Sequence, residues 1–472
     1  WGRGGWGVGW VGWFGWVGVG GGWGWGWGGG GGGGRLRVFG GGGALRGEVV
    51  VPGDKSISHR AVMLAALAQG ESVIDHWLPA GDTLATLATM RALGAAIMAQ
   101  PTTPQSWRLT VQGGGLLGLR APDAPLDCAN AGTCLRLLAG ILCGQSFASV
   151  LDGSAQLRRR PMRRITAPLR QMGAAISDTE GHAPLAIQPA PLRGIRYAMP
   201  VASAQVKSAI LLAGLYAQGE TAVFQPGPAR DHTERMLAHM GARLMAADGW
   251  VTLPPGSVHL APLHLTVPAD ISSAAFLLVA AGIVPHSQVT LRGVGVNPTR
   301  TGVLDALAAM GGAVTLAAQR EAGAGEPVAD LTMTFGEWRA VAIGGEMVVR
   351  AIDELPILAV AATQAAGRTV VRDAAELRVK EVDRIGALAG ELRKLGAAVT
   401  EQADGFVIEG PTRLRGARVH SHGDHRLGMA LAVAALVAEG ETIIEDAACM
   451  ADSFPGFVET MRALGAGMRY EV

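Results

Sequence analysis

The sequence predicts an α/β protein of two domains, each built from three copies of one repeating unit. Three observations predict this fold: a helix-ending signature recurs six times, a more apolar helix recurs between those signatures, and the loops are short throughout. A chain of 472 residues is longer than one hydrophobic core usually serves. Six copies of one unit therefore fit two domains of three better than one domain.

The helix-ending signature places a glycine after the last apolar turn, as in Met90-Arg-Ala-Leu-Gly94. Glycine readily takes the left-handed conformation that commonly ends a helix. Neighbouring copies are separated by about 70 to 85 residues, a period typical of a structural repeat. The six glycines are Gly94, Gly173, Gly241, Gly311, Gly396 and Gly465.

The second helix of each unit is apolar on most of its faces, which indicates burial. Its six copies cover residues 61–69, 135–142, 209–217, 274–281, 356–366 and 427–438. A β-branched run follows most of them, so each unit is predicted to be helix–strand–helix–strand.

The domain boundaries follow from this repeat. We expect a hinge near residues 260–268, and we expect the strand-like residues 48–51 to complete the C-terminal domain. The N-terminal lobe would then span residues 55–265. The C-terminal lobe would combine residues 35–54 with 266–472.

Residues 1–34 are rich in glycine and hold most of the chain's 12 tryptophans. No helical or strand periodicity can be assigned there, and such a segment cannot offset its ordering entropy by burial. It also has no uninterrupted apolar core of the kind a signal peptide needs. We interpret it as a disordered extension and an artefact of upstream translation.

Composition argues against several classes of partner. The formal net charge is +1 and 17% of residues are charged, which gives no general reason to expect nucleic acid or a membrane surface. The apolar runs at 271–285 and 427–439 are shorter than the roughly 20 residues that span a bilayer. The four cysteines form no C-x-x-C pair, so they support neither a zinc site nor a disulfide scaffold, and we expect a reduced, cytoplasmic protein. We also expect a monomer without a metal or other cofactor. The four cysteines are Cys128, Cys134, Cys143 and Cys449.

Polar residues introduce every buried helix, at 54–60, 130–133, 203–207, 270–273, 353–354 and 424–426. A helix N-terminus carries unpaired N–H groups and a partial positive charge, so it attracts anions. Ser or Asp there can be a simple N-cap. A cation is unfavourable at that position unless an anion compensates it. The cations Lys55, Arg60, Lys207 and Arg426 therefore predict a cleft that binds anions.

Further cations lie in two other segments. Five arginines fall within residues 158–164, but without interleaved aromatic residues they do not favour a nucleic-acid surface. Lys380 and Arg384 lie one helical turn apart beside Glu381. By itself that spacing cannot be told from a surface ion-pair pattern.

Taken together, these motifs resemble those of the 5-enolpyruvylshikimate-3-phosphate (EPSP) synthase family. The resemblance runs from about residue 44 to the C-terminus, with the motifs in the family's order. They are V-P-G-D-K-S-I-S-H-R-A at 51–61, N-A-G-T at 130–133, R-P-M at 160–162, S-A-Q-V-K-S at 203–208, R-D-H-T-E at 230–234, K-E-V-D-R at 380–384 and G-D-H-R at 423–426. The resemblance implies a two-domain inside-out α/β barrel of six βαβαββ repeats, three per domain, around an interdomain cleft.

The resemblance also implies a reaction and a site. The enolpyruvyl group of phosphoenolpyruvate would pass to the 5-hydroxyl of shikimate 3-phosphate, releasing phosphate, on the route to chorismate. Asp353 would be the base, Glu381 the acid, and Lys55 would face both substrates. Shikimate 3-phosphate would contact Lys55, Ser56, Arg60, Ser203, Ala204, Gln205, Arg230, Asp353 and Lys380. Phosphoenolpyruvate would contact Lys55, Gly132, Arg160, Arg384 and Arg426. This chemistry needs a base, an acid and dense positive charge, but no metal or covalent nucleophile.

Three positions depart from the family pattern. Val382 and Ala229 stand where the family commonly has a hydroxyl side chain, so a local hydrogen bond is absent at each. Asp452 stands where another branch of the family carries a lysine that binds phosphoenolpyruvate, and we assign it no role.

Three alternatives remain at this stage. The sister enolpyruvyl transferase that acts on UDP-N-acetylglucosamine carries a reactive cysteine before an Arg-Pro pair, and residues 152–161 contain no cysteine. A non-catalytic anion-binding module would not need both Asp353 and Glu381. A metal centre could use His420, His422, Asp424 and His425, although histidines at a helix start are more often caps or phosphate contacts.

Overall fold

The computed structural model describes residues 34–256 and 259–471. The interpretation of residues 1–34 as disordered therefore lies outside the described residues, apart from Gly34. In the part of the chain that the structure describes, none of the helices combines the length and the hydropathy that crossing a membrane would require.

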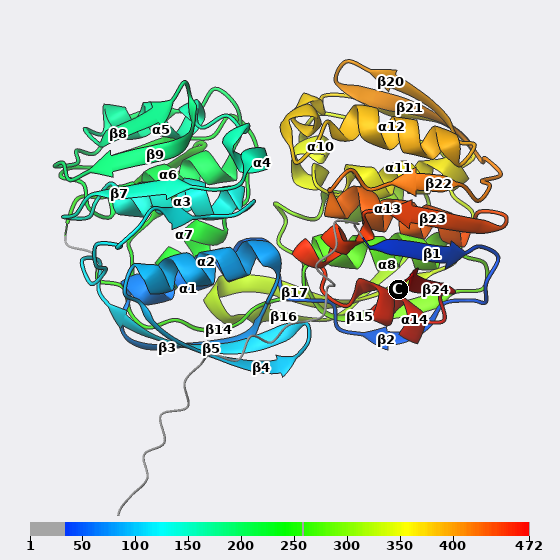
Figure 1. The fold of residues 1–472 in the computed structure, drawn as a ribbon, viewed down its shortest axis with the longest axis horizontal. Helices are drawn as coiled ribbons and strands as arrows, with labels where there is room; N and C mark the ends of the chain where they lie inside the picture. The colour runs from blue at the N-terminus through cyan, green and yellow to red at the C-terminus, as the bar shows by residue number, and fades with distance from the viewer. Residues whose placement is uncertain (1–33, 257–258, 472) are drawn as a thin grey trace, which may run out of the picture. The chain divides into compact units, whose positions relative to one another are not determined.

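The described residues form six sheets of four strands each (Figure 1). Every sheet has the same pairing scheme, with one parallel pair at one edge followed by two antiparallel pairs. The shared scheme supports the predicted sixfold repetition of one unit.

Three sheets come mainly from the first half of the chain. In spatial order their strands are β14 (His264–Thr266), β3 (Gln69–Trp77), β5 (Ser106–Gly114) and β4 (Ala96–Thr103); β6 (Leu126–Asp127), β7 (Ser149–Asp152), β9 (His182–Gln188) and β8 (Ala175–Thr179); and β10 (Arg196–Ala198), β11 (Thr221–Phe224), β13 (Trp250–Leu253) and β12 (Met245–Ala247).

The other three sheets come mainly from the second half. Their strands are β2 (Arg46–Val49), β15 (Gln288–Gly295), β17 (Glu326–Thr334) and β16 (Ala313–Ala322); β18 (Ala342–Ile343), β19 (Gly367–Val371), β21 (Gly405–Gly410) and β20 (Ala398–Gln402); and β22 (Arg418–His420), β23 (Glu441–Glu445), β1 (Arg35–Phe39) and β24 (Met468–Glu471).

All six predicted apolar helices form, and each begins several residues earlier than, or close to, the predicted start. They are α1 (Lys55–Leu67), α3 (Gly132–Leu142), α6 (Ala204–Gly214), α8 (Ile271–Ile283), α11 (Leu355–Gln364) and α13 (His425–Leu436). The signature helices are α2 (Gly81–Ala92), α5 (Arg163–Gln171), α7 (His232–His239), α9 (Gly302–Ala309), α12 (Arg384–Lys394) and α14 (Phe457–Ala463). All six predicted cap glycines have φ between +84° and +109°, which confirms the left-handed ends.

The repeating unit contains more strands than the helix–strand–helix–strand prediction. The second unit shows its full order: β6, α3, β7, the short α4 (Ala155–Arg158), α5, β8 and β9. A strand precedes the buried helix, and the second helix leads into a hairpin of two strands. The periodicity missed the leading strands because several, such as β6 and β18, are only two residues long and carry no periodic pattern. The βαβαββ unit that the family resemblance implies does include them.

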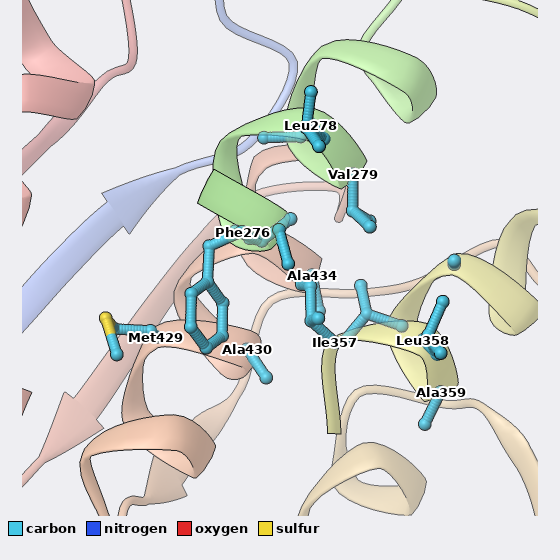
Figure 2. Packing of buried hydrophobic residues seen from close by; sticks show 14 of the residues in the cluster. Phe276, Leu278, Val279, Ile357, Leu358, Ala359, Met429, Ala430 and Ala434 are labelled. Atoms are coloured by element: carbon cyan, nitrogen blue, oxygen red, sulfur yellow. The ribbon is translucent and has the colours of Figure 1, made fainter. Parts of the chain in front are cut away.

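The buried helices of each half pack against one another. Figure 2 shows Phe276 of α8, Ile357 of α11 and Met429 of α13 converging in the second half. In the first half, α3 and α6 approach so closely that a Cβ on Gly140 would lie 2.3 Å from the carbonyl oxygen of Ala209. The buried apolar side chains fall into two clusters: residues 57–267 with Ala324, and residues 36–51 with 269–468.

Two segments connect these clusters, and they run side by side in opposite directions. The N–H of Asp54 donates to the carbonyl of Pro268 at 2.8 Å, and the N–H of Asp270 donates to the carbonyl of Pro52 at 2.9 Å. The strand predicted at 48–51 forms slightly earlier, as β2, and pairs with β15. Within the predicted hinge, β14 pairs with β3, so the return connection begins only at Val267.

The β16–β17 hairpin reaches from the second half to the first (Figure 1). Its tip is a 3-10 turn, η1 (Gly323–Gly325), and Ala324 there is buried in the first cluster. Arg235 of α7 donates to the carbonyl of Gly325 at 2.6 Å. The two halves therefore share more than the two connecting segments.

Candidate active site

A cavity of about 280 Å³ brings together every residue that the family resemblance assigns to the site. Lys55, Ser56, Arg60, Gly132, Arg160, Ser203, Ala204, Gln205 and Arg230 line it from the first half, and Asp353, Lys380, Glu381, Arg384 and Arg426 line it from the second. Residues separated by more than 300 positions in sequence thus meet in one site.

Many of the residues that line the cavity lie at helix N-termini. Lys55, Gly132, Ala204 and Arg384 are the first residues of α1, α3, α6 and α12, and Arg426 is the second residue of α13. Lys55, Arg384 and Arg426 therefore add their charge to the partial positive charge of their own helix ends, while Gly132 and Ala204 leave the backbone N–H groups of α3 and α6 close to the cavity. The structure thus brings several of the predicted helix starts to one cavity.

Several lead-in residues also cap these helices. Asp54 accepts from the N–H of Ile57 at 2.8 Å in α1. Asp424 caps α13 by accepting from Arg426 N at 2.8 Å, and its other oxygen accepts from Arg384 Nε at 2.7 Å. The same lead-ins therefore supply both helix caps and the cations that line the cavity.

Asp353 lies among cations from both halves. It accepts from Arg230 Nη2 at 2.6 Å, and its other oxygen lies 3.4 Å from both Lys380 Nζ and Arg384 Nη1. Burial opposes ionisation of this carboxyl, but Lys380, Arg426 and Arg230 outweigh it and hold the pKa of Asp353 well below its ordinary value. Asp353 is therefore ionised and fixed in orientation.

Glu381 is clamped in the same way. It accepts from Arg384 Nη2 at 2.6 Å and pairs with Arg160 Nη2, from the first half, at 3.0 Å. Burial would raise the pKa of Glu381, yet Arg384 and Arg160 hold it well below its ordinary value. An acid role requires a proton on this carboxyl, so it also requires those two arginines to be engaged elsewhere.

Arg60 and Gln205 line the cavity from the first half and are held in place by hydroxyl groups. Arg60 donates to Thr233 Oγ1 at 2.7 Å and to Ser208 Oγ at 3.0 Å. Burial lowers the pKa of Arg60 to about 10, so it stays charged at neutral pH. Gln205 donates to Thr133 Oγ1 at 2.9 Å, which fixes its amide plane.

The cavity also contains charged residues that the sequence analysis did not assign to the site, including Asp82, Arg136, Arg164 and Arg300. Asp82 accepts from Lys55 Nζ at 3.1 Å. Arg136 donates to Gln205 Oε1 at 2.6 Å, and burial lowers the pKa of Arg136 to about 9. Its position one turn after Gly132 on α3 was a usable signal. No local pattern marks Arg300, which arrives from the loop after β15.

One cation was misinterpreted. Lys207 is fully buried within α6, pairs with Glu234 and donates to Gln225 Oε1 at 2.7 Å, away from the cavity. Lys207 is the fourth residue of α6, and Glu234 of α7 supplies its counter-charge inside the protein. The inference that Lys207 signals an anion site was therefore wrong.

The remaining sequence features fall outside the centre of the site. Ala229 lines the cavity, whereas Val382 and Asp452 are not among its lining residues. Burial, with Asp82 nearby, raises the pKa of Asp452 to about 6.

The structure contradicts the metal-centre alternative. Asp424 is committed to Arg384, and His422 Nε2 lies 2.8 Å from Glu391. Across residues 34–256 and 259–471, no group of three or more His, Cys, Asp or Glu side chains is arranged to hold a metal ion.

The family model described as EPSP synthase (3-phosphoshikimate 1-carboxyvinyltransferase) matches residues 40–461. The chain belongs to the EPSP synthase family. It is 53% identical over 416 residues to the 3-phosphoshikimate 1-carboxyvinyltransferase of Geobacter sulfurreducens, covering 88% of this chain and 95% of that protein. It is 52% identical over 431 residues to the enzyme of the same name from Acidithiobacillus ferrooxidans, covering 91% and 98%.

Solved structures agree with this assignment. EPSP synthase from Acinetobacter baumannii superposes with a TM-score of 0.83 at 41% identity, covering 93% of this chain and all of that one. The enolpyruvyl transferase NikO from Streptomyces tendae, at 21% identity and a TM-score of 0.75, covers 93% and 99% and shares the fold. As a member of the EPSP synthase family, this chain transfers an enolpyruvyl group to shikimate 3-phosphate, a step of aromatic amino acid biosynthesis.

Proposed function

We propose that the two carboxylates of the cavity divide the acid–base work of this transfer, with Asp353 as base and Glu381 as acid. The observation that supports this division is that each carboxylate is held by cations from both halves of the chain: Arg230 and Lys380 on Asp353, Arg160 and Arg384 on Glu381. These are also the cations that the family resemblance assigns to the two substrates.

Shikimate 3-phosphate would bind Lys55, Ser56, Arg60, Ser203, Ala204, Gln205, Arg230 and Lys380. Its phosphate would draw Arg230 and Lys380 away from Asp353. The pKa of that carboxylate would then rise towards the range in which it removes a proton effectively. Asp353 would take the proton of the 5-hydroxyl of shikimate 3-phosphate while that hydroxyl oxygen attacks C2 of phosphoenolpyruvate.

Phosphoenolpyruvate would bind Gly132, Arg160, Arg384 and Arg426, with Lys55 between the two substrates. Guanidinium groups suit phosphate and carboxylate because their paired N–H groups match two oxygens at once. Once Arg160 and Arg384 engage this anion, burial dominates the environment of Glu381 and favours its protonated form. Glu381 would then protonate the methylene carbon, which becomes a methyl group. Glu381, now a carboxylate, would take a proton back from that methyl group as phosphate departs, and the C=C bond of the enol ether product would form.

We also propose the lobe division 55–265 and 35–54 with 266–472, an inside-out α/β barrel arrangement, and closure of the cleft over the substrates. The two buried clusters and the paired connecting segments support this division. Closure would exclude water and strengthen each charge interaction in the site. A monomer in the cytoplasm is proposed on the basis of the sequence alone.

Steady-state phosphate release by the full chain tests the carboxylate roles. Asp353→Asn and Glu381→Gln should each lower kcat by two or more orders of magnitude. Asp152→Asn is a matched control, since this carboxylate pairs with Arg158 outside the cavity. Circular dichroism establishes that all three variants are folded. Wild-type turnover in either active-site variant would refute that residue's role.

The UDP-N-acetylglucosamine alternative is tested in the same assay. Replacing shikimate 3-phosphate by UDP-N-acetylglucosamine should give no phosphate release, and turnover with it would overturn the substrate assignment.

A further inference from the structure

Arg300 lies where the two connecting segments join the two halves of the chain. It lies in the loop between β15 and α9, and its side chain is only 3% exposed. Its Nη1 donates to Asp54 Oδ2 at 2.8 Å, and its Nη2 contacts Asp270 Oδ1 at 3.2 Å and donates to Ser272 Oγ at 2.7 Å. One guanidinium therefore holds two buried carboxylates.

These two aspartates occupy equivalent places in the two halves. Asp54 is the N-cap of α1 and ends the first connecting segment, while Asp270 is the N-cap of α8 and ends the second. Asp270 also accepts from the N–H of Lys55 at 3.3 Å. Arg300 thus ties together the two points at which the connecting segments enter their helices.

The tied elements carry groups from opposite sides of the proposed site. In the first half, α1 begins with Lys55 and Ser56. In the second half, Ser272 of α8 donates to Glu354, the residue that follows Asp353. A shift of Arg300 would therefore change the placement of α1 relative to Asp353.

Arg300 also lines the cavity, so direct binding of a substrate anion is the alternative. Two facing carboxylates already compensate its single charge, and both terminal nitrogens are committed to them. An incoming phosphate would face Asp54 and Asp270 as well as the arginine. The contacts favour a positional role.

We propose that Arg300 is a positioning residue that sets the angle between the two halves, so that α1 and Asp353 act on the same substrate. This inference rests on the proposed site, and it goes beyond it by assigning a function to a residue outside the family motifs. Arg300 has no contact with the reacting atoms in this role.

A split between turnover and binding distinguishes positioning from other roles. In Arg300→Met, kcat should fall by about 10- to 100-fold because small misplacement of reacting groups is costly. The dissociation constant of shikimate 3-phosphate should change less than threefold, because most of its proposed contacts lie in the first half. Arg300→Lys keeps the charge but cannot hold both carboxylates in the same fork, and should recover only part of the turnover.

Arg292→Met is the matched control. Arg292 also contacts two carboxylates, Glu48 and Asp330, but its side chain is 47% exposed and lies outside the active-site cavity. Its turnover should stay at the wild-type level.

A double variant guards against a purely structural explanation. Arg300→Met with Asp270→Asn removes one of the carboxylates left unpaired, so it should recover thermal stability while kcat stays low. This variant also carries the test if Arg300→Met alone does not fold. Wild-type kcat in the double variant would overturn the proposal, as would a tenfold weaker substrate affinity at unchanged kcat. Full activity in Asp353→Asn would instead overturn the proposed site, so the two failures are distinguishable.

Discussion

The substitution Gly132→Ala tests the proposed phosphoenolpyruvate pocket, because an added Cβ would have to displace its neighbours by a few tenths of an ångström. Gly132 is the first residue of α3, and a Cβ added there would lie 3.1 Å from Arg136 Nη1 and 3.1 Å from Arg160 Nη1. Neither guanidinium can remain in place, because both contacts are tighter than ordinary van der Waals packing. Arg136 is bonded to Gln205 and Arg160 to Glu381, so each displacement strains a charge-assisted contact.

For Gly132→Ala we expect a loss of about 1–2 kcal/mol in phosphoenolpyruvate binding, which corresponds to a KM about 5- to 30-fold higher. The KM for shikimate 3-phosphate should change less than twofold, because none of its proposed contacts lies on α3. Phosphate release measured against each substrate in turn gives both values.

Gly390→Ala is the control for this experiment. It lies inside α12, and its added Cβ would meet nothing within 4 Å. It should leave both KM values unchanged and stabilise the helix by up to about 1 kcal/mol. An unchanged KM for phosphoenolpyruvate in Gly132→Ala, or an equal rise for both substrates, would refute the proposed placement of this substrate.

Three further predictions concern stability. Lys207→Met should lower the free energy of unfolding, measured in urea, by about 3–5 kcal/mol, because Glu234 is left unpaired. The double variant with Glu234→Gln should recover part of that free energy. Equal losses of stability in the single and double variants would contradict the buried pair. Gly140→Ala should cost at least about 1–3 kcal/mol, because its Cβ would overlap the Ala209 carbonyl of α6, and an unchanged melting temperature would show that these helices are not so closely packed. Because burial raises the pKa of Asp452 to about 6, its ionisation costs stability as pH rises from about 4 to 6. Asp452→Asn should thus melt higher than the wild type at pH 8 and equally at pH 4, and the reverse order would contradict the sign of this shift.

Repetition made most of the fold predictable from the sequence. The six cap glycines and the six apolar helices could be predicted because each depends on nearby residues. A glycine favours a left-handed helix end, and a helix that is apolar on most faces is expected to be buried. Short edge strands such as β6 were missed because they exist only through pairing with β7. The reach of the β16–β17 hairpin into the first half was also missed, because nothing in the sequence around Ala324 indicates which core it joins.

The site was predictable to the extent that its residues sit in motifs at helix starts. Lys55, Gly132 and Arg426 could be placed by that rule, and the structure brings them to one cavity. The rule failed for Lys207, because Glu234 in the next helix, α7, supplies the counter-charge. The proposed role of Arg300 could not be predicted from the sequence. It depends on Asp54 and Asp270, which end the two connecting segments and come together only in the folded protein.

The central claim is that one cavity binds both anions through the cations that hold Asp353 and Glu381. A crystal structure of the full chain with shikimate 3-phosphate and a non-reactive analogue of phosphoenolpyruvate tests it most directly. The analogue should lie between Arg160, Arg384 and Arg426, and Glu381 should no longer be paired to both Arg160 and Arg384. An analogue bound elsewhere, or one bound there while Glu381 keeps both arginine contacts, would contradict it.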